Sequence, residues 1–126
     1  MNKKRVSVQE IIKKDAEATG ADFEKLYTYF FQEIQAGRMR IMRHGNTLMI
    51  YSILQPKVAE VHIVSADKPR EIIEAIKDFE KAMKKAGFVK VVSDTDNMAI
   101  VRLLQAANVP VKVTPMNGKY HLEFGV

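Results

Sequence analysis

The sequence contains no cysteine and no tryptophan among its 126 residues. A chain without cysteine forms neither disulfides nor thiolate-based zinc sites. Its three histidines, His44, His62 and His121, are scattered along the chain, without the short regular spacing of metal ligands. We therefore expect no metal centre in this protein.

Long hydrophobic runs are also missing. No segment approaches the roughly 18 consecutive apolar residues that a membrane-spanning helix requires. The basic residues of Met1–Arg5 lead into an amphipathic segment, where a secretory signal would place an apolar one. The sequence thus predicts a cytoplasmic protein without a membrane partner.

What the chain does contain is typical of one globular domain. Hydrophobic residues make up 47% of the sequence and charged residues 28%, and the length is ordinary for a single core. We expect residues 1–126 to fold as one domain. The net charge of +5 is compatible with a nucleic-acid partner, but an excess of lysine also serves solubility alone.

Two helices are predicted at the start of the chain. Ser7 and Glu10 have the spacing of a capping box, in which each side chain satisfies an amide of the first turn. This helix ends near Ala18, and Asp22 starts a second helix that ends at Gly37. The second helix has an apolar face at spacings of three and four, formed by Phe23, Leu26, Tyr27, Phe30, Phe31 and Ile34.

A β-hairpin is predicted next. Residues 38–43 and 47–54 flank the short loop His44-Gly45-Asn46, which is a typical hairpin pattern. The second strand is nearly continuous in apolar residues, so we expect it to be buried on both faces. The first strand carries Arg38, Arg40 and Arg43. These arginines could bind nucleic-acid phosphates, but positive charge also protects an edge strand from pairing, and we favour that interpretation.

The centre of the chain has the pattern of a βαβ unit. A strand over Val58–Val64, a helix from about Pro69 to Ala86 and a strand over Phe88–Val92 predict two parallel strands joined by a crossover helix. Asp67 is placed to cap this helix. Its buried face is expected to consist of Ile72, Ile73, Ile76, Phe79, Ala82 and Met83.

Glu60 and His62 are the candidate catalytic residues. Both lie on the first strand of the βαβ unit, and alternate residues of a strand share one face. A carboxylate beside an imidazole is an arrangement that general acid or base catalysis uses. The alternative is a partly solvated pair near a strand end, with no catalytic role.

The chain ends with a helix and a second hairpin. The polar cluster Ser93–Asn97 is expected to open a helix that continues to about Ala107. Strands over Pro110–Thr114 and Lys119–Phe124 follow around a turn at residues 116–118. The predicted order is ααβββαβαββ, an α/β domain with a mixed sheet and a central parallel βαβ unit.

This order, the parallel pair and the segment Asp96-Asn97-Met98-Ala99-Ile100-Val101-Arg102-Leu103-Leu104-Gln105-Ala106-Ala107-Asn108-Val109 resemble the GNAT superfamily of acyl-CoA-dependent N-acyltransferases. The resemblance implies a GNAT-like fold, with Glu60 at the position of the catalytic base. It also implies acetyl-CoA binding at Ser65, Lys68 and Arg70, and at Asn97.

Two departures fall on the chemistry of that family. The joint Ser65–Arg70 contains no glycine, although glycine lets a main chain approach a pyrophosphate closely. Leu104 stands where the family often has a tyrosine that protonates the departing thiolate.

The sequence Val64-Ser65-Ala66-Asp67 resembles more closely the divergent GNAT-like virion proteins of short-tailed bacteriophages. That likeness implies a non-catalytic protein without a cofactor, which binds protein partners in a phage particle or during its assembly. It would then be found in the host cytoplasm or the virion. The alternative is an acyl-CoA-dependent N-acyltransferase with an atypical cofactor loop.

Overall fold

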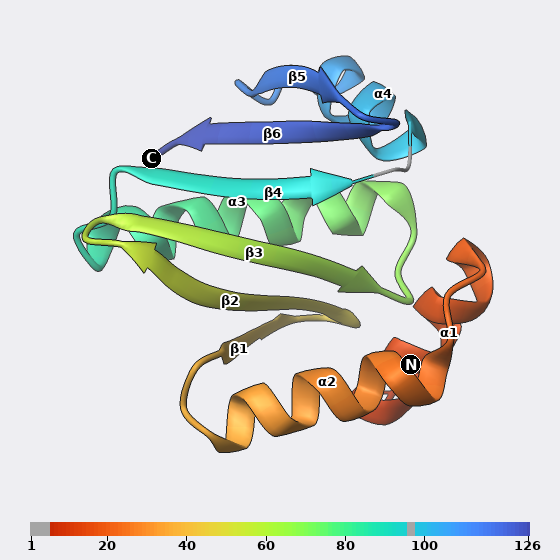
Figure 1. The fold of residues 1–126 in the computed structure, drawn as a ribbon. Helices are drawn as coiled ribbons and strands as arrows, with labels where there is room; N and C mark the ends of the chain where they lie inside the picture. Colours follow the sequence, from red (N-terminus) through yellow and green to blue (C-terminus); the bar gives the residue numbers. More distant parts are fainter. Residues whose placement is uncertain (1–5, 96–97) are drawn as a thin grey trace, which may run out of the picture.

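The computed structural model describes residues 6–95 and 98–126, and their elements follow the predicted order (Figure 1). The helices are α1 (Val8–Thr19), α2 (Phe23–Gln35), α3 (Pro69–Lys85) and α4 (Met98–Ala106). The strands are β1 (Arg40–His44), β2 (Thr47–Gln55), β3 (Val58–Ser65), β4 (Lys90–Thr95), β5 (Lys112–Met116) and β6 (Lys119–Gly125).

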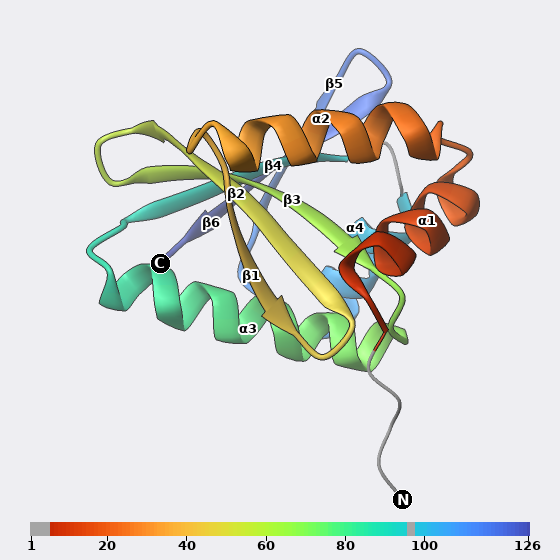
Figure 2. The same ribbon diagram turned by 90° about the horizontal axis from the view of Figure 1, so that it is seen from below.

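The strands form one mixed sheet in the order β1-β2-β3-β4-β6-β5. All neighbours are antiparallel except β3 and β4, which are parallel and joined through α3. Helices α1 and α2 pack on β2 and β3 on one face, and α3 lies on the other face (Figures 1 and 2). No helix covers β4 and β6 on the α2 side in Figure 1. The predicted α/β architecture is thus confirmed.

The two faces of the sheet bury separate apolar clusters. Between α3 and the sheet lie Ile76, Phe79 and Met83, packed with buried residues of β2, β3, β4 and β6 such as Val61 and Phe124. On the other face, α1 and α2 cover a smaller cluster that includes Ile11, Phe30, Leu48, Ile50 and Val64. Because strand residues alternate between faces, β3 directs Val61 to one cluster and Val64 to the other.

Strand β4 begins and ends later than the sequence predicted. Phe88 belongs to the end of α3, since its amide donates to the carbonyl of Met83 at 3.0 Å. Ser93 and Thr95 continue the strand and pair with β6, so the prediction that they open a helix is wrong. The rest of that polar cluster, residues 96–97, lies outside the described part of the chain.

Strand β2 is buried only in its first half. Residues 47–50 are buried, whereas residues 53–55 are exposed, so the prediction of burial along the whole strand is wrong for its end. The reason is geometric, because the hairpin of β2 and β3 reaches past α2 at this end of the sheet (Figure 2). Ile53 and Leu54 are therefore left 59% and 54% exposed.

The short turns follow the predicted chemistry. Asn117 and Gly118 both have positive φ, 44° and 78°, which is what a tight hairpin turn between β5 and β6 requires. Among residues 6–95 and 98–126, no helix is both long and apolar enough to cross a bilayer.

Phe79 provides a test of the α3 interface. It is 3% exposed and meets Tyr51 of β2 edge-on, with ring centroids 5.4 Å apart. We expect Phe79→Ala to lower the free energy of unfolding by about 3–5 kcal/mol, because the lost ring leaves a cavity. Lys81→Ala, on the exposed side of α3, should change it by less than about 0.5 kcal/mol. Equal denaturation midpoints for the two variants would contradict this packing.

Candidate functional site

The site is organised by the divergence of β3 and β4. Their ladder contains only three residue pairs, from Val58–Lys90 to Glu60–Val92. Beyond it, the Ser93 hydroxyl donates to the carbonyl of Val61 at 2.7 Å. This bond satisfies a buried carbonyl that would otherwise lack a partner in the ladder, and such carbonyls are costly to leave unpaired. The Ser93 side chain therefore links the two strands at the point where they begin to diverge.

Glu60 and His62 lie together beside this gap, as predicted. His62 Nε2 is 3.9 Å from Glu60 Oε1, and both side chains are just over one-third exposed. The imidazole also packs on the ring of Phe30 from α2, with centroids 5.5 Å apart. Its buried Nε2 has no hydrogen-bond partner among the described residues. The pair thus faces the α1/α2 side of the sheet.

The surroundings of His62 favour the neutral imidazole. Burial lowers its pKa below the ordinary value of 6.5, and the charges of Glu60 and Asp94 oppose this shift less strongly. Burial disfavours the charged form of a base, whereas nearby carboxylates favour it. At neutral pH the ring therefore carries no charge and can accept a proton at one nitrogen.

Three more polar side chains share this face of the sheet. Asp94 of β4 is paired with His121 of β6, and Oδ1 of Asp94 lies 2.7 Å from Nδ1 of His121. Glu123 Oε1 lies 3.5 Å from the other nitrogen of that ring. We call the surface of Glu60, His62, Asp94, His121 and Glu123 the open face. The sequence analysis did not predict the part of the open face formed by Asp94, His121 and Glu123, because it ended the strand at residue 92.

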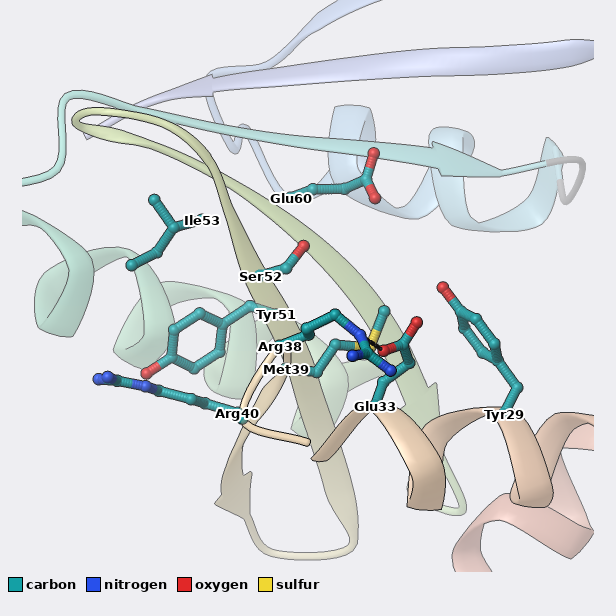
Figure 3. A pocket seen from close by; sticks show the side chains of 10 residues that line it. Tyr29, Glu33, Arg38, Met39, Arg40, Tyr51, Ser52, Ile53 and Glu60 are labelled. Atoms are coloured by element: carbon teal, nitrogen blue, oxygen red, sulfur yellow. Dashed lines mark hydrogen bonds and ion pairs between the residues drawn. The ribbon is translucent and has the colours of Figure 1, made fainter. Parts of the chain in front are cut away.

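Two hollows adjoin the open face. The first, of about 500 Å³, lies between α2, β2 and β3 (Figure 3) and is lined by Tyr29, Glu33, Arg38, Ser52 and Glu60, among others. The second, of about 450 Å³, lies at the gap between β3 and β4 and is lined by residues that include Asp15, Phe30, His62, Asp94 and Lys119. Cavities of this size are typical of ligand sites. Glu60 lines the first hollow and His62 lines the second, so the pair lies between them.

The joint between β3 and α3 is closed by hydrogen bonds inside the protein. The Ser65 amide donates to Asp15 Oδ1 at 3.2 Å, and the Ala66 amide donates to the Asn46 carbonyl at 3.0 Å. The Asp67 amide donates to the Ser65 hydroxyl at 2.9 Å. The first three amides of the joint are therefore engaged within the fold.

Asp67 does not cap α3, so that prediction is wrong. The residue that precedes the helix is Lys68, which makes no side-chain cap. The Asp67 carboxylate points the other way and accepts hydrogen bonds from the Asn46 amide and the Thr47 hydroxyl, both at 2.8 Å. It thereby fixes the β1–β2 turn to the joint. Gly45 is needed in this turn, since a Cβ there would lie 3.2 Å from Asp67 Oδ2 at a φ of +59°.

The candidate cofactor residues do not converge. The Ser65 hydroxyl is 2.7 Å from that of Thr47 and faces the turn. Lys68 is exposed, and Arg70 is 92% exposed beside Glu74, one helical turn away. Asn97 lies outside the described residues.

The three arginines of the first hairpin are also separated. Arg38 pairs with Glu33 of α2. Arg43 donates to the carbonyls of Val6 and Gly45 and to the side chain of Asn46. Arg40 and Arg43 are three residues apart on β1 and so lie on opposite faces. This geometry fits the edge-strand interpretation better than a phosphate clamp, and β1 is indeed an edge strand.

No family model matches the sequence, and no curated protein matches it either. Solved structures do match the fold. An aminoglycoside 6'-acetyltransferase type Ii superposes with a TM-score of 0.68 at 7% identity, over 94% of this chain and 86% of that one. An IAA acetyltransferase from Bacillus cereus gives 0.62 at 12% identity, over 96% and 93%. The chain has the GNAT fold.

A third structure supports the same conclusion. A ribosomal-protein-alanine N-acetyltransferase from Brucella melitensis superposes with a TM-score of 0.55 at 10% identity, over 84% of this chain and 80% of that one. Identities this low establish the shared GNAT fold, and function has to be argued from the site itself. Within the described residues, no group of three or more histidines and carboxylates is placed to hold a metal ion.

The pKa of His62 gives a direct test of the site. We expect NMR titration to place it below 6.5, and Glu60→Gln to lower it further, because the substitution removes the carboxylate that favours the charged ring. Glu74→Gln, on α3 across the sheet, should leave it unchanged. Since the unfolded chain binds this proton more readily, acidification below 6.5 should destabilise the fold through His62. A His62 pKa above 6.5 would contradict the burial argument.

Proposed function

We propose that this chain is a GNAT-fold binding protein that does not hold acyl-CoA at the β3–α3 joint. The observation that carries the proposal is the engagement of the Ser65, Ala66 and Asp67 amides inside the protein. A pyrophosphate at a helix N-terminus needs main-chain amides that point at the ligand. Pro69 adds no amide, and the amides of Glu71 and Ile72 donate to the Lys68 carbonyl. The engagement of three consecutive amides of the joint thus argues against a cofactor pyrophosphate there.

Asp67 supports the same conclusion through its charge. Its carboxylate lies at the joint, where a bound pyrophosphate would meet a like charge. Turning it away would leave the Asn46 amide without its acceptor and the Thr47 hydroxyl with the Ser65 hydroxyl alone. An unsatisfied buried donor costs about 1–3 kcal/mol. The existing arrangement is thus favoured over one that admits phosphate.

The partner in this proposal is a protein segment bound on the open face. The diverging strands and the two adjoining hollows give a concave surface, and Glu60 and His62 supply polar contacts at its centre. Extended segments commonly bind in such grooves beside a sheet. The likeness of residues 64–67 to phage virion proteins supports a partner in a phage particle or its assembly.

An acyl-CoA-dependent N-acyltransferase is the second candidate. The observation in its favour is the neutral imidazole of His62 beside Glu60 on the open face, because a neutral base there could accept the proton of an acceptor amine. Such an enzyme would have to hold its cofactor without the amides of Ser65, Ala66 and Asp67, with the exposed side chains of Lys68 and Arg70 as candidate cations.

Isothermal titration with acetyl-CoA separates the two candidates. We expect no binding in the micromolar range, because the amides of Ser65, Ala66 and Asp67 already donate to acceptors inside the protein. A micromolar dissociation constant, which corresponds to a binding free energy of about −8 kcal/mol, would contradict the binding-protein proposal and favour the transferase. The double variant Lys68→Ala, Arg70→Ala is the control, since it would reveal whether any binding observed depends on the cations at the joint.

Partner capture at low and high salt tests the proposed surface. We expect a discrete protein partner that survives high salt, is lost with Glu60→Ala and is kept with Arg40→Glu, because the contact is centred on the open face. Contacts to phosphates weaken steeply as salt rises, whereas apolar protein contacts change little. Recovery of nucleic acid alone, lost at high salt and with Arg40→Glu, would exclude the protein partner.

A further inference from the structure

One end of the molecule gathers lysines around exposed aliphatic side chains. The β2–β3 turn meets the loop between α3 and β4 there, since the amides of Val89 and Lys90 donate to the Lys57 carbonyl at 2.9 and 3.3 Å. The end of α3 lies at the same end of the sheet in both views (Figures 1 and 2). We call this surface the lysine tip, and its residues are Ile53, Leu54, Lys57, Lys81, Lys84, Lys85, Val89 and Lys90.

The aliphatic residues of the lysine tip are poorly explained by folding. Ile53, Leu54 and Val89 are all more than half exposed. Ile53 and Leu54 lie near the end of β2, just before the turn whose Lys57 carbonyl accepts the amide of Val89. Single exposed aliphatic residues are common, but several gathered at one end of a molecule typically mark an interaction site. Their exposure at one end therefore calls for a partner with an apolar layer.

The charge of the lysine tip is uncompensated. None of its five lysines forms an ion pair within the part of the chain that the structure describes. Glu80, the acidic residue nearest in sequence to Lys81 and Lys84, instead lines a small internal cavity beside Phe79. The partner is therefore expected to carry negative charge as well as an apolar layer.

We propose that the lysine tip docks on the surface of an anionic lipid bilayer, with Ile53, Leu54 and Val89 entering the interface and the lysines on the headgroups. Both components have a role in this contact, because buried apolar area and attraction to anionic lipids add together in interfacial binding. Nucleic acid would use the lysines alone. The tip is a projecting turn, which suits a flat surface, whereas a protein would have to supply a groove.

The contact is separate from the open face and does not depend on the proposed function. Each lysine near an anionic surface strengthens binding about fivefold. Replacing two of them should therefore weaken binding about 25-fold, and reversing their charge should weaken it further.

Vesicle sedimentation tests the proposal on the full chain. We expect binding to vesicles of phosphatidylcholine with a quarter phosphatidylglycerol and none to phosphatidylcholine alone. The double variant Lys84→Glu, Lys85→Glu should abolish it. Lys13→Glu, Lys14→Glu is the matched control, since it makes the same charge change on exposed residues of α1 and should retain most binding.

The apolar component is tested by Leu54→Ser, which should weaken vesicle binding about tenfold. Met116→Ser, an equally exposed residue of β5, should not. Circular dichroism of each variant checks that it folds.

Two results with vesicles would overturn the proposal. One is a failure of the protein to bind anionic vesicles, and the other is an equal loss of binding in the Lys84/Lys85 and Lys13/Lys14 double variants. If the protein bound duplex DNA but not vesicles, and Leu54→Ser left the DNA binding unchanged, the lysine tip would be a nucleic-acid surface instead.

Discussion

The early end of the β3–β4 ladder is the constraint on which the open face depends. A parallel pair that continued in the same register would bring β3 and β4 together up to Ile63 and Thr95. Instead the pairing stops at Glu60 and Val92, while β4 goes on with β6 over six residue pairs. Strand β4 thus stays paired with its antiparallel neighbour β6 after its pairing with the parallel neighbour β3 has ended. This agrees with the slightly greater stability of antiparallel pairing per residue. His62 and Asp94 consequently line a gap rather than adjoining positions of a ladder.

The joint shows how a protein can satisfy the amides that precede a helix with its own acceptors. A helix N-terminus after a strand attracts anions because its amides lack partners inside the helix. Here Asp15, Asn46 and the Ser65 hydroxyl already accept the amides of the joint. Asp67 then fastens the β1–β2 turn to the same loop. Interactions that a ligand could have supplied are made by the protein, so the joint is structured without one.

Local patterns predicted most of the fold, and contacts between distant residues explain what they missed. The spacing of Ile76, Phe79 and Met83 was enough to orient α3, because helical periodicity is a local property. Asp67 was assigned to α3 because capping is also local, yet its partners are 20 and 21 residues earlier in the chain. The start of β4 was misplaced because Phe88 and Val89 look like strand residues, although the end of α3 and the β2–β3 turn take their amides.

The candidate site was predicted only where one strand defined it. Glu60 and His62 were found because alternation along β3 places them together, whereas Asp94 and His121 are joined by pairing between β4 and β6 that no short motif indicates. The lysine tip has the same origin, since Lys57 and Lys90 are joined by a hydrogen bond between segments that are distant in sequence. The expectation of no membrane partner considered spanning segments alone, and contact with a bilayer surface depends on different residues.

The net charge of +5 is distributed unevenly, and this distribution bears on both proposed contacts. The open face carries the carboxylates of Glu60, Asp94 and Glu123 beside neutral His62, whereas the lysine tip carries five lysines. An anionic surface should therefore attract the tip and repel the open face, which orients the molecule as it approaches. With the tip on such a surface, the open face would remain available to a protein segment. The two contacts are thus compatible in one molecule.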